Sequence, residues 1–439
     1  MDNQQYQRQR RSAHALPGPD DTLRETLPNG ITVLARENFA SPAVVVSGYV
    51  EAGAEDEPAE LHGLTSFTLD MMERGTQHRS FEELYEAVEA IGASFGLSAG
   101  THISSFSAKG LASSLPLLMD IISDLLRRPA FPEKHVEKVR AEILTDIQER
   151  HDSTRRMAAR AFHELAYPAN HPYHHSLTGY TDTIARIQRG DLVDFHRRHF
   201  APNGLTLVIV GAVKTKDALD IVRETFGDWE RTRPARAPLP DAPTLTERRE
   251  RQVLIPDKMQ SNLVLGWPGP SRLHPDFIAC GVTNTILGIF GMYGRLGKKV
   301  REENGLAYYA YSRIDGGKGP GPWRVIAGVN PMNLERAITL IQEELRRIRA
   351  ERVPEEELED SKSFLTGSLP LQLETNEGVA QSLINIERYQ LGLDYLQRYR
   401  DIIMAITAED VQAAAQQWLD PENFALAIAR PPQPESPAS

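Results

Sequence analysis

The feature that most constrains the fold of this chain is a repeat, because two similar sequence patterns lie on either side of a proline-rich segment. That segment is ERTRPARAPLPDAPTLTERRER (230–251), and its four prolines and alternating charges without an apolar period are typical of an extended linker. Both halves close with a segment in which an acidic residue precedes a proline by eleven positions: Asp191 and Pro202, then Asp410 and Pro421. The chain is therefore predicted to contain two copies of one domain of roughly 200 residues.

Each half mixes two kinds of pattern. Runs such as AVVVSGYV (43–50) and NFALAIA (423–429) indicate strands, whereas KHVEKVRAEILTDIQERH (134–151) and LERAITLIQEELRRIRAER (334–352) have the apolar period of amphipathic helices. Because the two kinds do not strictly alternate, we expect the α+β class, with two homologous domains, each a mostly antiparallel sheet with helices covering one face. The predicted segments are an N-terminal disordered tail 1–21, a first domain 22–228, a linker 229–251, a second domain 252–430 and a C-terminal tail 431–439.

Composition excludes several classes of protein. The net charge of -11 comes from 49 basic and 60 acidic residues without a polybasic tract, which argues against a nucleic-acid binder. Cys280 is the single cysteine, so no internal disulfide is possible. No apolar run approaches the length of a membrane span, and the polar N-terminus lacks the apolar core of a signal peptide. We therefore expect a soluble, cytoplasmic protein that does not bind membranes.

The segment GLTSFTLDMMERGT (63–76) reads as a short helix in which the apolar side chains form one stripe and Gly75 is the stop signal. Ser66, Leu69 and Asp70 lie on another face at positions i, i+3 and i+4. An inverted zinc-peptidase motif places His, Glu and His at this spacing. None of the three expected residues is present here.

With these motifs the chain resembles the insulinase/pitrilysin superfamily of inverted zinc peptidases, and in particular its short two-domain members, which are akin to mitochondrial processing peptidase subunits. The likeness spans roughly residues 22–430. It rests on the duplicated halves and on three motifs, which are GLTSFTLDMMERGT (63–76), YPANHPYHHSLTGYTDTI (167–184) before HFAPNGLTLVIVGAV (199–213), and GRLGKKVREENGLAYYAYS (294–312).

The resemblance implies a zinc site that this chain has lost. Ser66 and Asp70 stand at the positions of the two zinc-binding histidines, and Leu69 stands at the position of the glutamate base. Asp146 stands at the position of the distal glutamate ligand. A serine hydroxyl stays protonated at neutral pH, and leucine cannot deprotonate water. Two aspartates suit calcium or magnesium better than zinc, so a residual metal at Asp70 and Asp146 stays open beside a simple solvated acidic pair. We expect no metal cofactor in this chain.

A second feature of the family is retained. Arg301 and Tyr308 match an arginine and a tyrosine that the family places seven positions apart, in its second domain, to hold the substrate backbone and stabilise the tetrahedral intermediate. A guanidinium and a phenol both donate hydrogen bonds to a carbonyl oxygen as it gains charge. The plainer interpretation is that Arg301 pairs with a neighbouring glutamate and Tyr308 packs in a core.

The resemblance thus predicts the non-catalytic subunit of a heterodimeric zinc metallopeptidase. Such a chain has no peptidase activity of its own, completes the peptide-binding chamber and supplies Arg301 and Tyr308 to a zinc-bearing homologous partner that cleaves peptides. The alternative is a non-proteolytic scaffold of the same fold, either a homodimer or a core subunit of a larger complex.

Overall fold

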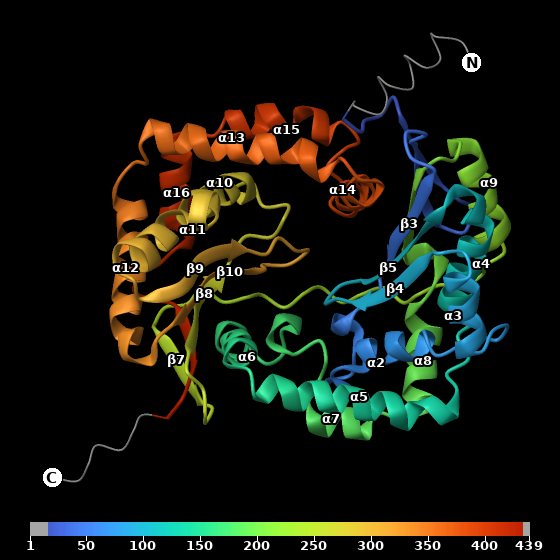
Figure 1. Cartoon of the computed structure of the whole chain (residues 1–439), viewed down its shortest axis with the longest axis horizontal. Coiled ribbons are helices and arrows are strands. Elements are labelled where there is room, and N and C mark those ends of the chain that lie inside the picture. The colour runs from blue at the N-terminus through green and yellow to red at the C-terminus, as the bar shows by residue number, and fades with distance from the viewer. Residues whose placement is uncertain (1–15, 433–439) are drawn as a thin grey trace. The chain divides into compact units, whose positions relative to one another are not determined.

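The computed structural model describes residues 16–432 of the 439-residue chain, and these residues form two compact units (Figure 1). Within the described residues, unit 1 comprises 16–145, 176–237 and 369–399, and unit 2 comprises 146–175, 238–368 and 400–432. Each unit therefore contains one segment from the opposite half of the sequence. Because the units do not follow the linear halves, the domain limits near residues 228 and 252 stay a prediction.

Unit 1 is built on a sheet with the strand order β1-β2-β6-β3-β5-β4. Only the β2–β6 pair is parallel, and the other pairs are antiparallel. The strands are β1 (Thr22–Thr26), β2 (Thr32–Glu37), β3 (Ala43–Val50), β4 (Ser94–Ala99), β5 (Ser104–Leu111) and β6 (Leu205–Gly211). Its helices are α2 (Leu64–Met72), α3 (Phe81–Glu89), α4 (Leu115–Arg127), α7 (Thr181–Arg186), α8 (Arg189–His199), α9 (Thr215–Phe226), α14 (Asn376–Arg388) and most of α5 (Glu133–His151).

Unit 2 repeats this arrangement with the strand order β7-β11-β8-β10-β9. The β7–β11 pair is parallel and the rest are antiparallel, as in β2-β6-β3-β5-β4 of unit 1. The strands are β7 (Arg249–Leu254), β8 (Ser261–Pro268), β9 (Ala307–Ile314), β10 (Pro322–Val329) and β11 (Ala425–Arg430). Its helices are α6 (Thr154–Ala166), α10 (Phe277–Gly288), α11 (Phe290–Leu296), the π-helical η6 (Gly297–Glu303), α12 (Leu334–Ala350), α16 (Ala408–Trp418), most of α13 (Glu355–Gln372) and the second half of α15 (Tyr395–Met404). The predicted duplication and α+β class are confirmed.

The exchanged segments carry equivalent helices. In unit 1, α14 comes from the second half of the sequence and packs on β3 and β6, where Leu383 joins a buried cluster with Val45 and Val208. In unit 2, α6 comes from the first half and packs on β7, β8 and β11. Because alternate side chains of a strand point to opposite faces, and Val44 and Val46 are buried as well as Val45, the centre of the first sheet is covered on both faces. The sequence had indicated helices on one face only.

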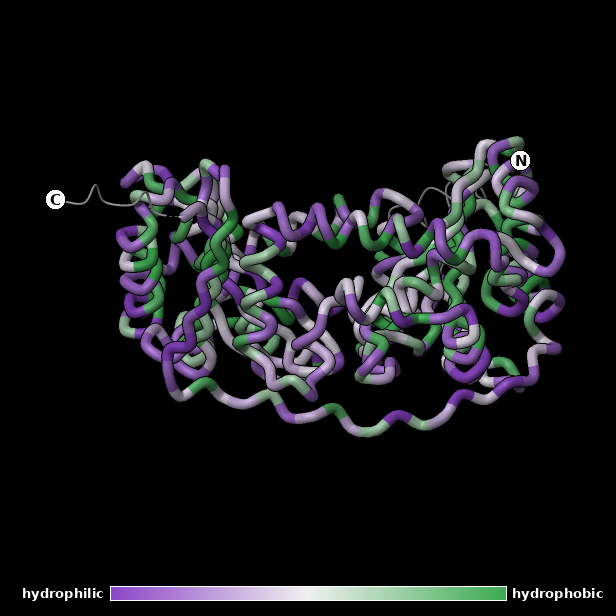
Figure 2. Tube along the Cα trace, turned by 90° about the horizontal axis from the view of Figure 1, so that it is seen from below, coloured by the Kyte–Doolittle hydropathy of each residue, from purple (hydrophilic) through white to green (hydrophobic). Residues whose placement is uncertain are grey.

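Hydrophobic residues concentrate in the central strands of each unit, whereas the helices alternate hydrophobic and hydrophilic residues along their length (Figure 2). The strand β6 is buried at every position, and β11 at all but its last. Such strands have no solvated face, so helices must pack on both sides of them.

Two segments that the sequence assigned to a tail and a linker are partly packed. Residues 16–21 precede β1, and the Asp21 carboxylate accepts a hydrogen bond of 2.9 Å from Arg36 Nε. In the linker, Trp229 is 5% exposed and Arg233 Nη2 lies 2.6 Å from Glu51 Oε2. Because Trp229 is buried and Arg233 is ion-paired within unit 1, the first part of the linker follows the surface of that unit. Residues 1–15 and 433–439 of the two predicted tails lie outside the described residues.

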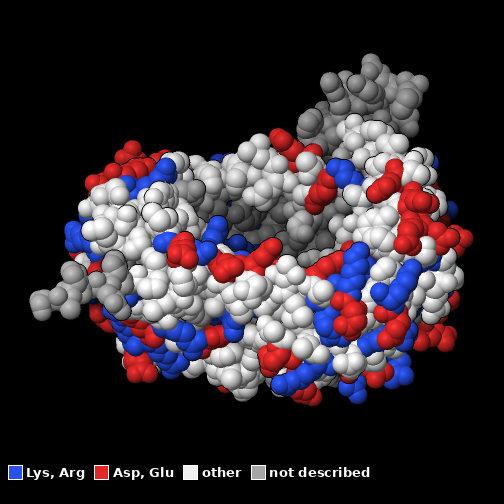
Figure 3. Space-filling model, turned by 60° about the horizontal axis from the view of Figure 1, so that its bottom comes forward, with Lys and Arg blue, Asp and Glu red and all other residues white. Residues whose placement is uncertain are grey.

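Acidic and basic side chains are interspersed on the face drawn in Figure 3, as the sequence suggested. Within residues 16–432, no helix is long and apolar enough to span a membrane. Cys280 is fully buried, and burial raises the pKa of its thiol, so it is an inert packing residue.

Candidate functional site

The helix α2 carries three of the predicted site positions, and its start is fixed by two features of unit 1. The Glu57 carboxylate accepts hydrogen bonds from the backbone N–H groups of Gly63 (2.9 Å) and Thr65 (2.7 Å), which are unpaired donors at the helix N-terminus. Gly63 has φ +96°, and a side chain there would collide with Gly179. The glycine is therefore required by both conformation and space.

Ser66 and Leu69 serve packing in this helix. The Ser66 hydroxyl donates a hydrogen bond of 2.7 Å to the backbone carbonyl of Leu177, which ties α2 to the segment before α7. Leu69 is 3% exposed and belongs to the core. One position that would hold a metal ligand thus holds a structural hydrogen bond, and the position of the catalytic base is an apolar contact.

Asp70 is the remaining position on α2, and it has an unusual electrostatic environment. Its side chain is reached by solvent, but the surrounding protein raises the pKa of its carboxyl to about 6, with further contributions from the Glu73 and Glu142 carboxylates and partial relief from Arg74. Glu142 is itself paired with Arg74 at 2.7 Å. Glu73 and Arg74 follow Asp70 by three and four positions, whereas Glu142 lies on α5 and could not be identified as a neighbour from the sequence.

Asp146 lies on α5 at the start of the segment assigned to unit 2, where it is paired with an arginine. Both of its carboxylate oxygens lie 2.8 Å from Nη2 of Arg156 on α6. A guanidinium that occupies both oxygens competes directly with any cation. Within the described residues, no group of three or more His, Cys, Asp or Glu side chains could hold a metal ion.

We expect Asp70→Asn to stabilise the protein at neutral pH and to leave it unchanged in acid. The folded pKa of about 6 exceeds the ordinary value of 3.8, so folding favours the protonated carboxyl. Its ionisation therefore costs stability that is absent below about pH 4, grows between about pH 4 and 6, and is complete above that range. Because the side chain is solvent-accessible, we expect a gain of only about 1 kcal/mol at pH 7.5.

The measurement is urea unfolding of the wild type and the variant at pH 4 and at pH 7.5. Asp146→Asn is the matched control, because it removes one carboxylate that is ion-paired with Arg156 and should not stabilise the protein. An equal gain for Asp70→Asn at pH 4 and pH 7.5 would contradict the raised pKa.

Arg301 and Tyr308 lie close together along the chain in unit 2. Arg301 is in the last turn of η6, where its carbonyl accepts a hydrogen bond of 3.0 Å from the Gly305 N–H. Gly305 has φ +63°, the left-handed conformation that ends helices. This turn leads directly into β9. Among the described residues, the structure records no hydrogen bond or ion pair for the Arg301 side chain, and the nearby Glu303 pairs instead with Lys299 at 3.7 Å.

Tyr308 sits at a β-bulge. Ala307 pairs with Val329 and Tyr309 pairs with Gly328, so Tyr308 has no residue opposite it in the neighbouring strand β10. A bulge re-aims the side chain of the extra residue, and such irregularities are frequent beside active sites. The Tyr308 side chain is 68% exposed, and β9 is the outer strand of its sheet. The alternative in which Tyr308 packs in a core is therefore wrong.

The rest of β9 is held firmly by contacts within unit 2. The Tyr309 hydroxyl donates a hydrogen bond to Asn262 Oδ1, and the Asn262 amide donates one of 2.7 Å to Thr154 Oγ1 on α6. The Tyr311 hydroxyl accepts a hydrogen bond of 3.1 Å from Arg155. The strand thus positions Tyr308 through its neighbours and leaves its own hydroxyl available.

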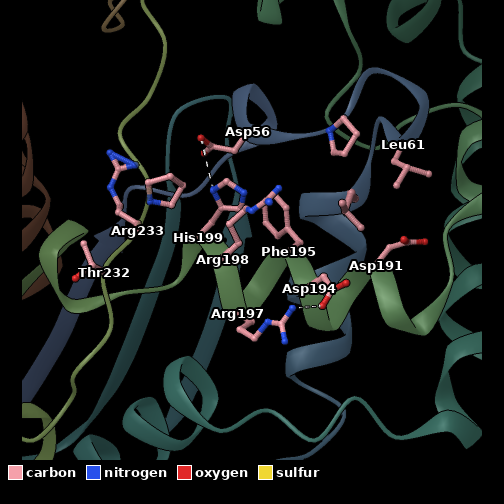
Figure 4. A pocket seen from close by; sticks show the side chains of 13 residues that line it. Asp56, Leu61, Asp191, Asp194, Phe195, Arg197, Arg198, His199, Thr232 and Arg233 are labelled. Atoms are coloured by element: carbon pink, nitrogen blue, oxygen red, sulfur yellow. Dashed lines mark hydrogen bonds and ion pairs between the residues drawn. The ribbon is translucent and has the colours of Figure 1, made fainter.

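A cavity of about 680 Å³ lies in unit 1 between α8, the segment around the turn η1 (Ala54–Asp56) and the start of the linker (Figure 4). It contains none of the predicted site positions. Figure 4 shows the His199 ring facing Asp56, with 3.8 Å between Nδ1 and Oδ1, and burial lowers the pKa of this histidine. Asp56 is also bound by Arg236 through Nε at 2.9 Å. Because linker arginines neutralise the acidic groups here, this arrangement anchors the linker to unit 1.

Comparisons with known proteins match both halves of the chain. A model described as Insulinase (Peptidase family M16) matches residues 32–179, and one described as Peptidase M16 inactive domain matches residues 186–365. An uncharacterized zinc protease of Streptomyces coelicolor is 28% identical over 406 residues, which cover 90% of this chain and 87% of that protein. A probable mitochondrial-processing peptidase subunit beta of Arabidopsis thaliana is 23% identical over 432 residues, covering 96% and 80%.

The fold has a close counterpart among solved structures. A peptidase M16 inactive domain from Pseudomonas fluorescens superposes with a TM-score of 0.88, covering 95% of this chain and all of that one at 22% identity. This likeness extends over both units and concerns the fold alone.

Proposed function

Because the chain belongs to the insulinase family of peptidases, M16, we propose that it is the non-catalytic subunit of a heterodimeric zinc metallopeptidase. In this proposal a homologous partner carries the zinc ion and cleaves the peptide, and this chain contributes the Arg301 and Tyr308 side chains to substrate binding. Zinc in that partner would polarise the scissile carbonyl and activate water.

The observation that carries the proposal is the contrast between the two sets of family positions. Ser66 and Leu69 are committed to a backbone hydrogen bond and to the core, and Asp146 is committed to Arg156. Within residues 16–432, the side chains of Arg301 and Tyr308 have no hydrogen-bond or ion-pair partner, and Tyr308 is exposed at a bulge. A chain selected only to fold would gain nothing from a solvent-facing tyrosine at this position.

An outer strand of unit 1 supports a peptide as the substrate. β4 (SFGLSA) is the last strand of its sheet and contains no charged residue or proline, the features that usually protect a sheet edge. It pairs along its whole length with β5, and one of its N–H groups, that of Leu97, donates a hydrogen bond of 2.8 Å to Glu73 Oε1. An extended peptide can add to such an edge through main-chain hydrogen bonds, which are independent of sequence.

The alternative function, a non-proteolytic scaffold, requires different chemistry from a peptidase subunit. A homodimer or a core subunit needs the fold and a partner surface, but it needs no donor for a reacting carbonyl. The two functions therefore differ in whether substitution of Arg301 and Tyr308 changes a reaction.

We expect the purified chain alone to contain far less than one zinc per molecule and to cleave no peptide. Activity should appear when the chain is mixed with a homologous subunit that has an intact inverted motif, and it should exceed that of the homologue alone. Elemental analysis and a quenched fluorescent peptide assay measure the two quantities. The control is the mixture in which the homologue lacks its glutamate base. Near-stoichiometric zinc in this chain, lost together with peptidase activity on Asp146→Ala, would overturn the proposal.

A further inference from the structure

A second cavity, of about 580 Å³, lies in unit 2 between α11 and η6 on one side and α12 and α13 on the other. It shares no residue with the α2 positions and includes neither Arg301 nor Tyr308. Its volume falls in the range of small-molecule sites.

The charges around this cavity do not balance. Six carboxylates and four cationic side chains line it: Glu302, Glu303, Glu344, Glu356, Glu357 and Asp360, with Arg295, Lys298, Lys299 and Arg347. Three of the cations are paired with lining carboxylates, at 2.8 Å for Arg295 with Glu357, 3.7 Å for Lys299 with Glu303 and 3.6 Å for Arg347 with Glu344. The carboxylates of Glu302, Glu356 and Asp360 have no recorded partner among the described residues, and only Lys298 is left to offset them. The cavity therefore has an excess of two negative charges.

Three deeply buried side chains at the cavity also have a polar atom without a hydrogen bond. They are Glu344 (4% exposed), Ser361 (0%) and Arg295 (9%), through Oε2, Oγ and Nη1. A buried polar atom without a partner costs about 1–3 kcal/mol. Two of the three atoms, the carboxylate and hydroxyl oxygens, can accept hydrogen bonds. They add acceptors to a site that already attracts cations.

The remaining lining is apolar. Met292 is 53% exposed, and Phe290 packs its ring against Phe364 with 5.8 Å between the ring centres. Ile286 and Pro354 complete this wall. Methylene groups between two charged ends can lie against such a surface while the ends reach the carboxylates.

We propose that this cavity binds a ligand that carries ammonium groups at the ends of methylene chains. Free polyamines and the lysine side chains of peptides share this chemistry. Two ammonium groups match the two excess negative charges. Glu302 and Glu303 follow Arg301 directly on η6, so the ligand contacts the element that carries that arginine. The site stands whether or not the chain takes part in peptide cleavage.

The test is isothermal titration of the full-length chain with spermidine at moderate salt. We expect one saturable site, and we expect Glu356→Gln with Asp360→Asn to weaken binding at least tenfold, because both carboxylates are exposed and can be neutralised without disturbing the core. The matched control is Glu60→Gln with Glu335→Gln, which removes the same charge from exposed positions outside the cavity and should leave binding unchanged.

A blocked dilysine peptide separates the two sources of the ligand. Binding of both probes assigns lysine side chains as well as polyamines to the site, and binding of spermidine alone assigns free polyamines. The proposal is overturned if neither probe gives a saturable site. It is also overturned if the cavity variant and the control variant weaken binding equally, since that result shows general attraction to an acidic protein.

Discussion

Tyr308→Phe is expected to slow peptide cleavage by the reconstituted heterodimer about a hundredfold while leaving the fold and the dimer intact. The substitution removes one hydroxyl donor and keeps the ring. Because Tyr308 is 68% exposed and its hydroxyl has no hydrogen-bond partner among the residues that the structure describes, its loss breaks no hydrogen bond with them. A donor that acts only on the developing oxyanion lowers kcat and kcat/KM together, with little change in KM. Steady-state kinetics with a fluorogenic peptide measures both constants.

Tyr311→Phe is the matched control on the same strand. Its hydroxyl accepts a hydrogen bond from Arg155 within unit 2, so its removal touches local packing but no substrate. We expect the rate to stay within about twofold of the wild type, because such a substitution usually has a small effect. Arg301→Ala should lower the rate as Tyr308→Phe does and should raise KM more, since a guanidinium also holds the ground-state backbone. Full activity of the double variant would show that this chain is a scaffold.

Leu383→Ala is expected to lower the free energy of unfolding by about 3 kcal/mol. Leu383 lies on α14, is 0% exposed and packs in the cluster that contains Val45 and Val208 of the unit 1 sheet. Removing its isobutyl group leaves a cavity in a close-packed core. Urea unfolding, followed by circular dichroism, measures the change.

Leu371→Ala provides the comparison for this prediction. Leu371 is also helical, on α13, but its side chain is 65% exposed. We expect a change within about 0.5 kcal/mol, as for most surface substitutions. Equal effects of the two substitutions would mean that α14 does not form part of the core of unit 1.

The sequence alone determined the class of fold, whereas the loss of the zinc chemistry stays a prediction. Strand and helix periods are local properties, so the runs 43–50 and 134–151 appear as β3 and α5 without tertiary information. The residue types at the motif positions are also a local property, since a serine and a leucine stand at 66 and 69 whatever the fold is. Arg301 and Tyr308 were identified through the resemblance to the peptidase family, and their role in substrate binding stays a prediction.

Only the tertiary structure decided which partners these elements meet. An amphipathic helix presents an apolar stripe but does not specify which sheet will cover it, so the exchange of α6 and α14 between the sequence halves could not be predicted. The pairing of Asp146 with Arg156, the raised pKa of Asp70 and the acidic cavity beside η6 all depend on side chains from different elements. The bulge at Tyr308 depends on the register of β9 against β10, which is set by contacts across the whole sheet. Sequence patterns encode what each residue can do, whereas long-range packing decides which residues act together.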